Sequence, residues 1–165
     1  MNKALIVLDV QQGVFKEDIH NKAKVIQTIN TLIDRCRLKD VPVIFIQHED
    51  EDLKAGEPDF EICPELHRLE TDCHITKTKW DAFYRTPLDA YLKARSITQL
   101  YIVGAQTEYC MDTTIRCGFS LGYKFFFFTD GHTTFDNTIP AGQIIMHHQK
   151  IWDQRFGNLM DIDLI

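Results

Sequence analysis

The chain has 165 residues, of which 44% are hydrophobic, and its 24 acidic against 18 Lys and Arg residues give a formal net charge of −6. This length and apolar share are typical of a single globular domain with an ordinary core, and we expect one domain over residues 1–165. The acidic balance, without a basic run interleaved with aromatics, argues against a nucleic-acid surface. Asp9 interrupts the first apolar run, so no signal peptide is expected, and the apolar cluster 125–128 is too short to span a membrane.

The cysteines favour a reducing compartment. Their number is odd and none of them forms a Cys-x-x-Cys pair, which argues against a disulfide framework or a zinc site. A disulfide between Cys63 and Cys73 is the alternative interpretation. We therefore expect a cytoplasmic protein with free thiols at positions 36, 63, 73, 110 and 117.

The first half of the chain predicts two strands around one helix. Residues 4–8 form an apolar run that ends at Asp9, and residues 41–46 form a second one. Between them, apolar residues recur at helical spacing over 25–36. The acidic, irregular stretch 47–69 then contains Gly and Pro residues, and so long a connection is usually a functional loop.

The second half continues the alternation of strand and helix. Alternation of this kind predicts a mostly parallel sheet covered on both faces, that is, a three-layer α/β/α sandwich of Rossmann-like type. The expected elements are a strand at 73–76, a helix that begins at Thr86-Pro87-Leu88-Asp89, a strand from Leu100, a helix that ends before Gly122, a strand at 123–129, a helix from Thr138 and a closing strand at 159–162.

The stretch 100–114 carries the first chemical signal. A buried strand ends at the small residues Gly104-Ala105, and a helix then begins around Cys110. The free N–H groups of a helix start favour a thiolate and can hold an oxyanion. The competing interpretation is that Cys110 is simply a small buried hydrophobic residue.

Two more polar residues follow strand ends. Asp9 ends the first strand and Lys79 lies just past the third, while Cys110 follows the fourth. Ligands of such sheets bind beyond the carboxyl ends of the strands, where the strand order reverses, so these residues can meet there. Asp9 would take the thiol proton and deliver it to a leaving amine, and Lys79 would stabilise the thiolate and fix the carboxylate. Taken singly, Asp9 is typical of a turn cap and Lys79 of a surface lysine.

Three segments together resemble a known superfamily: LIVLDVQ at 5–11, KWDAF at 79–83 and VGAQTEYCMDTT at 103–114. Shorter pieces at 86–88, 122–123 and 129–131 add to them. The chain resembles the isochorismatase-like cysteine hydrolases, which include nicotinamidases and carbamoylsarcosine amidase-like enzymes. The resemblance implies the isochorismatase-like hydrolase fold, a catalytic triad of Asp9, Lys79 and Cys110, and a cis peptide between Ala105 and Gln106. It also implies an oxyanion hole made by the backbone N–H groups of Gln106 and Cys110.

The resemblance further implies a small, partly apolar pocket. For Phe83 and Tyr109, ordinary core packing is the competing interpretation. The residues expected in or beside the pocket are Gln11, Phe15, His48, Trp80, Phe83 and Tyr109.

One departure from the nicotinamidases concerns their metal site. Those enzymes carry Asp-x-His and a further His after the second strand, and residues 47–52 here lack that spacing. We therefore predict no catalytic metal and no other cofactor. A metal held by His48 with Glu49, Asp50 or His67 is the alternative to a solvated acidic loop.

The leading hypothesis is a metal-independent cysteine hydrolase that cleaves the C–N bond of a small amide, imide or ureido compound through a Cys110 thioester. The alternatives are isochorismatase-type vinyl-ether hydrolysis, a non-catalytic binding or scaffold protein, and a redox-sensing cysteine. The expected partners are a small-molecule substrate and further copies of the chain in a dimer or tetramer, without nucleic acid or membrane. The sequence does not name the substrate.

Overall fold

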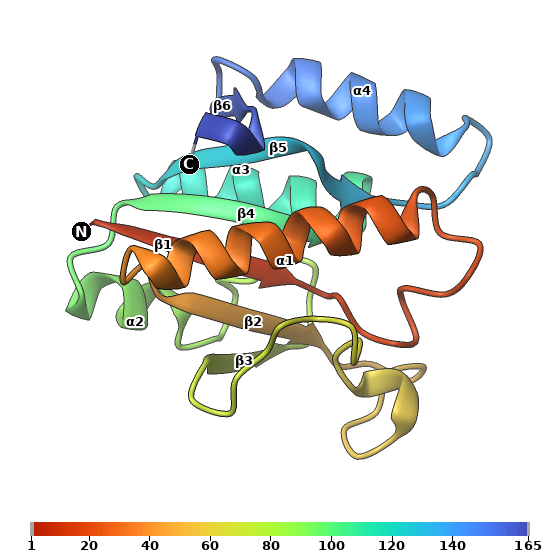
Figure 1. Cartoon of the computed structure of the whole chain (residues 1–165), viewed down its shortest axis with the longest axis horizontal. Coiled ribbons are helices and arrows are strands. Elements are labelled where there is room, and N and C mark those ends of the chain that lie inside the picture. The colour runs from red at the N-terminus through yellow and green to blue at the C-terminus, as the bar shows by residue number, and fades with distance from the viewer. Residues whose placement is uncertain (1, 165) are drawn as a thin grey trace.

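The computed structural model describes residues 2–164, and its centre is a six-stranded sheet (Figure 1). All strand pairs are parallel, so the prediction of a mostly parallel sheet is confirmed. The strand order is β3-β2-β1-β4-β5-β6. The strands are β1 (Lys3–Leu8), β2 (Val43–His48), β3 (Cys73–Lys77), β4 (Gln99–Ala105), β5 (Lys124–Thr133) and β6 (Gly157–Met160).

Helices cover both faces of this sheet and complete the expected three layers (Figure 1). Helix α1 packs on one face against Leu5 and Val7, while α2, α3 and α4 pack on the other against Ala4, Ile6 and Leu8. This division follows from the alternation of side chains along a strand. No helix within residues 2–164 is long and apolar enough to cross a membrane. The helices are α1 (Lys22–Leu38), α2 (Leu88–Ala94), the π-helical turn η2 (Thr107–Met111), α3 (Asp112–Ser120) and α4 (Ala141–Trp152), with 3₁₀ turns η1 (Pro58–Phe60) and η3 (Ile162–Leu164).

The predicted element ends differ from the observed ones at several places. Strand β5 continues to Thr133 and the last strand begins at Gly157, whereas runs at 123–129 and 159–162 were expected. Helix α4 starts at Ala141 because Pro140 occupies its N-cap position in an extended conformation. Strands β2 and β3 extend to His48 and Lys77, and these two residues pair with each other. This last difference changes the composition of the candidate site.

The strand order reverses between β1 and β4, which lie side by side. Leu8 pairs with Gly104 at the end of this contact. Gly104 has φ +130°, and a Cβ atom there would lie 1.9 Å from the Leu8 carbonyl oxygen. Only glycine permits this approach. The two strand ends therefore deliver their following residues, from Asp9 and from η2, to one point.

Candidate active site

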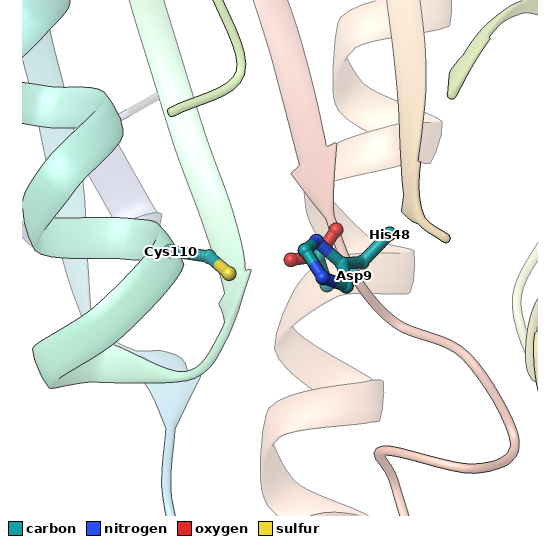
Figure 2. A group of neighbouring side chains, drawn as sticks. All are labelled: Asp9, His48 and Cys110. Atoms are coloured by element: carbon teal, nitrogen blue, oxygen red, sulfur yellow. The ribbon is translucent and has the colours of Figure 1, made fainter. Parts of the chain in front are cut away.

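Asp9 and Cys110 meet at this point of reversal, as the sequence predicted. Asp9 follows β1 with a left-handed backbone (φ 53°), and its N–H donates to the Ile46 carbonyl at 2.8 Å. Cys110 lies in η2, directly after β4. Both side chains are buried, and Figure 2 shows them facing each other across the strand ends. The ligand atoms of Asp9, His48 and Cys110 all lie within 4.8 Å of one another.

The lysine at this point is Lys77, and the expectation of Lys79 is wrong. Lys77 Nζ lies 2.8 Å from Asp9 Oδ2 and 3.2 Å from Cys110 Sγ, and the residue is only 1% exposed. Lys79 is exposed and faces a neighbouring hollow beside Trp80. Side chains alternate along β3, so Ile75 and Lys77 point inward, whereas Lys79 lies beyond the strand end. Positions 77 and 79 have the same parity, so the end of β3 at Lys77, rather than the alternation alone, separates the two lysines.

The sulfur of Cys110 is held as a thiol rather than as a thiolate. Burial raises the pKa of Cys110, and the negative charge of Asp9 raises it further, while Lys77 lowers it by less. This differs from the expectation that the helix start and the lysine favour the thiolate. Nucleophilic attack therefore needs a base that removes the thiol proton at the moment of reaction.

Asp9 is placed to be that base. Its Oδ2 pairs with Lys77, and its Oδ1 receives no hydrogen bond from the side chains and backbone of the described residues. A buried carboxylate oxygen without a donor is costly and retains its capacity to accept a proton. The nearby thiol of Cys110 can supply this proton.

His48 completes the surroundings of the ammonium. Its Nδ1 lies 2.8 Å from Lys77 Nζ, and its Nε2 lies 3.2 Å from Asp50 Oδ2. Burial and the Lys77 charge lower the pKa of His48, so the ring is neutral at neutral pH, with Nδ1 accepting and Nε2–H donating. The three hydrogens of the ammonium thus face Asp9, Cys110 and His48.

Gln11 does not line the pocket but holds the backbone of His48 in place. Its amide nitrogen donates to the His48 carbonyl at 3.0 Å, and its Oε1 accepts from the His48 N–H at 2.8 Å. The same amide also donates to the Phe60 carbonyl at 2.9 Å. Gln11 therefore connects the end of β2 to the loop that covers the site.

A cavity of about 200 Å³ opens onto Cys110. Of the predicted pocket residues, His48, Trp80 and Tyr109 line it. Phe15 and Phe83 do not: they are 1% and 8% exposed and lie in the two apolar cores, where large aromatic side chains gain most from burial. Three further residues line the cavity that were not among the predicted pocket residues, namely Val14, Asp50 and Leu53.

Comparison with known proteins decides the family. The family model described as Isochorismatase domain matches residues 3–162. The chain belongs to the isochorismatase domain family of hydrolases. It is 29% identical over 161 residues to the ureidoacrylate amidohydrolase RutB of Cronobacter sakazakii, covering 73% of this chain and 69% of the relative. It is also 29% identical over 180 residues to nicotinamidase 3 of Arabidopsis thaliana, covering 97% of this chain and 85% of the relative.

A solved structure supports the same assignment. The crystal structure of an isochorismatase family protein superposes with a TM-score of 0.93 at 36% identity, covering 96% of this chain and 98% of that one. The cis peptide that the resemblance implied is present between Ala105 and Gln106. Gln106 lines the cavity together with Cys110, although their roles in an oxyanion hole stay a prediction.

In this member of the isochorismatase family, the cluster of Asp9, His48 and Cys110 also has the composition of a metal site. However, the Lys77 ammonium lies 2.8 to 3.2 Å from an atom of each of these three residues. A metal ion bound to all three would have to displace this cation and deprotonate Cys110. The arrangement therefore fits an ammonium better than a divalent ion.

Proposed function

We propose that this protein is a metal-independent cysteine hydrolase that cleaves a C–N bond of a small amide, imide or ureido compound. The observation that carries the proposal is the contact of Asp9, Lys77 and Cys110 at the floor of a cavity. A nucleophile, a proton acceptor and a fixed cation within hydrogen-bonding reach are the parts that acyl transfer needs.

In the first half-reaction, the Cys110 sulfur attacks the substrate carbonyl carbon while Asp9 takes the thiol proton. Lys77 stabilises the negative charge as it develops on the sulfur and keeps the carboxylate in place. The backbone N–H groups of Gln106 and Cys110 would hold the oxyanion. When the C–N bond breaks, Asp9 returns the proton to the leaving nitrogen, and a thioester remains on Cys110.

In the second half-reaction, water attacks the thioester. Asp9, again ionised, takes a proton from that water and delivers it to the departing sulfur. The products are a carboxylic acid, or a carbamic acid from a ureido substrate, and an amine or ammonia. His48 is a positioning residue in this scheme because it touches the Lys77 ammonium rather than the reacting atoms.

The named relatives favour C–N bond cleavage over other hydrolyses. RutB is named an amidohydrolase and the Arabidopsis thaliana relative a nicotinamidase. Vinyl-ether hydrolysis would leave the Cys110 nucleophile without a role, and a scaffold function would leave the buried pair of Asp9 and Lys77 without one. A buried ion pair is expensive to desolvate, and function is a sufficient reason to retain it.

A screen of small amides, imides and ureido compounds for ammonia or amine release tests the proposal. The intact protein should turn over at least one compound, and Cys110→Ala should abolish this turnover. Cys117→Ala is the matched control, because Cys117 lies on α3, directly after η2, but does not line the cavity, and it should retain activity. Full activity in Cys110→Ala would refute the proposal.

The expected homo-oligomer and cytoplasmic location stay predictions, which size-exclusion chromatography and fractionation can test.

A further inference from the structure

The charged side chains around the cavity mouth are acidic. Asp50 lines the cavity, and its side chain is 46% exposed. It belongs to a run of four acids, Glu49 to Asp52, on the loop that follows β2. Its Oδ1 accepts the N–H groups of Asp52 and Leu53, at 2.9 and 3.0 Å, so the carboxylate is held in place by its own turn.

The part of the chain between residues 2 and 164 places no Lys or Arg on the cavity wall. Lys77 is buried beneath the wall and is engaged by Asp9, His48 and Cys110. Lys79 lines the neighbouring hollow together with Asp81. A substrate carboxylate would therefore find an acidic mouth without a counter-ion.

His48 does not neutralise Asp50. It donates one hydrogen bond to Asp50 Oδ2, but it is uncharged at neutral pH because burial and Lys77 lower its pKa. The groups that face His48 are Asp9, Lys77 and Cys110 on the inner side and Asp50 on the outer side. A neutral His48 therefore places no positive charge beside the Asp50 carboxylate.

Two aromatic side chains line the same cavity as Asp50. Trp80 and Tyr109 both line the cavity, and their ring centroids lie 5.0 Å apart at 55°. Trp80 is 54% exposed, so part of its indole is open to an entering molecule. The faces of such rings attract cations and give nothing comparable to anions. A carboxylate and two aromatic rings at one mouth are a typical arrangement for binding a small organic cation.

We propose that the substrate is a small amide that carries a positive charge, and that Asp50 is the residue that selects this charge. The inference rests on the proposed function, because the cationic group is placed relative to an amide at Cys110. The cavity of about 200 Å³ is smaller than the roughly 300–1,000 Å³ pockets of drug-sized ligands, so the molecule is compact. An amino acid amide has this chemistry, whereas a dicarboxylate does not.

Charged thiol reagents test the selection without any substrate. The probes are 2-aminoethyl methanethiosulfonate, a cation, and 2-sulfonatoethyl methanethiosulfonate, an anion. Each transfers its thioalkyl group to the sulfur and releases methanesulfinate, while the thiol proton leaves to solvent. The rates at Cys110 are followed by peptide mass spectrometry, which separates this thiol from the other four, and each rate is divided by that of a small free thiol.

The normalised rate for the cation should exceed that for the anion, and Asp50→Asn should lower this ratio about fivefold or more. Glu51→Gln is the matched control: it removes the same charge from an exposed neighbour that does not line the cavity, and it should leave the ratio nearly unchanged. Since the amide oxygen of the substituted side chain would still accept the two N–H groups of the turn, the loop should keep its shape. As a second measurement, raising the salt from 50 to 500 mM should lower the ratio in the unaltered protein.

A ratio of one or less in the unaltered protein, or equal decreases in both variants, would overturn the inference. Turnover of an amide series separates this failure from failure of the proposed function. Glycinamide, propanamide and malonamate place a cation, no charge and an anion near the same amide group. If none of the three amides is hydrolysed although the reagents show the preference for the cation, the proposed function fails and the charge selection stands. If malonamate is hydrolysed fastest, the inferred substrate class is wrong.

Discussion

Lys77 is the residue at the centre of the candidate site. Its buried ammonium contacts Asp9, Cys110 and the neutral imidazole of His48 at once. Removing one partner of a buried ion pair typically costs about 3–5 kcal/mol, since the other charge is left without compensation. The lysine therefore contributes to the stability of the fold as well as to the proposed reaction.

Substitutions at the two lysines should separate their roles. Lys77→Gln should lower kcat/KM by about 10²-fold or more, because neither the developing thiolate nor Asp9 would retain its cation. Lys79→Gln, the matched control on the exposed neighbour, should remain within about twofold of the unaltered protein. Thermal unfolding of both variants shows whether Lys77→Gln is folded at the assay temperature. Comparable decreases of kcat/KM in the two variants would contradict the assignment of Lys77, rather than Lys79, to the site.

Asp9 should affect the reactivity and the turnover of Cys110 in opposite directions. The carboxylate raises the pKa of Cys110, so Asp9→Asn should lower that pKa, and each unit of decrease raises the thiolate fraction at pH 7 about tenfold. Alkylation by iodoacetamide should therefore become faster, as measured by mass spectrometry. Amide turnover should nevertheless be lost, because the general base is gone. Slower alkylation in Asp9→Asn would show that the carboxylate activates the thiol in the resting protein.

The sequence predicted that Asp9 and Cys110 meet, but it assigned the wrong lysine to them. Asp9 and Cys110 follow apolar runs whose ends are plain in the sequence. The segment 79–83 points to Lys79, and Lys77 has the same parity along the chain, so alternation does not separate the two lysines. The decisive fact is that β3 continues by one residue and pairs His48 with Lys77, and strand ends are set by the neighbouring strand rather than by local composition.

At the scale of elements, the contact between β1 and β4 determines whether the site forms. Gly104 has no room for a side chain, because a Cβ would lie 1.9 Å from the Leu8 carbonyl oxygen. Its φ of +130° is also a conformation that residues with a side chain rarely adopt. Any substitution there must separate the two strand ends that carry Asp9 and η2.

Gly104→Ala should therefore reduce the free energy of unfolding by more than about 3 kcal/mol, from backbone strain and displaced strands together. Gly122→Ala provides the comparison: its φ of +95° is also positive, but a Cβ there would have no atom within 4 Å. It should cost only the backbone strain, about 1–2 kcal/mol. Urea denaturation measures both values. Equal decreases of the free energy of unfolding in Gly104→Ala and Gly122→Ala would show that small shifts of the backbone relieve the contact with Leu8.

The succession of elements was predictable, whereas the loop that shapes the pocket was not. The central strands are continuous apolar runs and the helices show an apolar period of 3.6 residues, and both signals depend on local sequence alone. The stretch 47–69 has no such period. Its shape depends on distant contacts, such as the bridge between Gln11 and Ile62 and the bond from Gln11 to the Phe60 carbonyl. Asp50 and Leu53, which lie on this stretch, line the cavity.

At the scale of the whole molecule, one buried histidine connects three elements behind the site. His132, on β5, is 1% exposed and hydrogen bonds to Thr107 Oγ1 at 2.9 Å and to the side chain of Gln149 at 3.1 Å. Thr107 begins η2, and Gln149 lies on α4. Because the Gln149 amide nitrogen donates to Nε2, the Nδ1–H donates to Thr107, and the ring is neutral.

This histidine should make the stability of the whole chain dependent on pH. Burial lowers the pKa of His132 to about 3, against about 6.5 in the unfolded chain, so between these values the unfolded state binds the proton and the folded state does not. Stability should then fall by up to ~1.4 kcal/mol per pH unit as the pH drops below about 6. His132→Gln should remove this part of the slope, whereas the exposed His147→Gln should retain it. Urea denaturation at pH 7 and pH 5 measures the difference, and equal slopes in all three proteins would mean that acid reaches His132 without unfolding the chain.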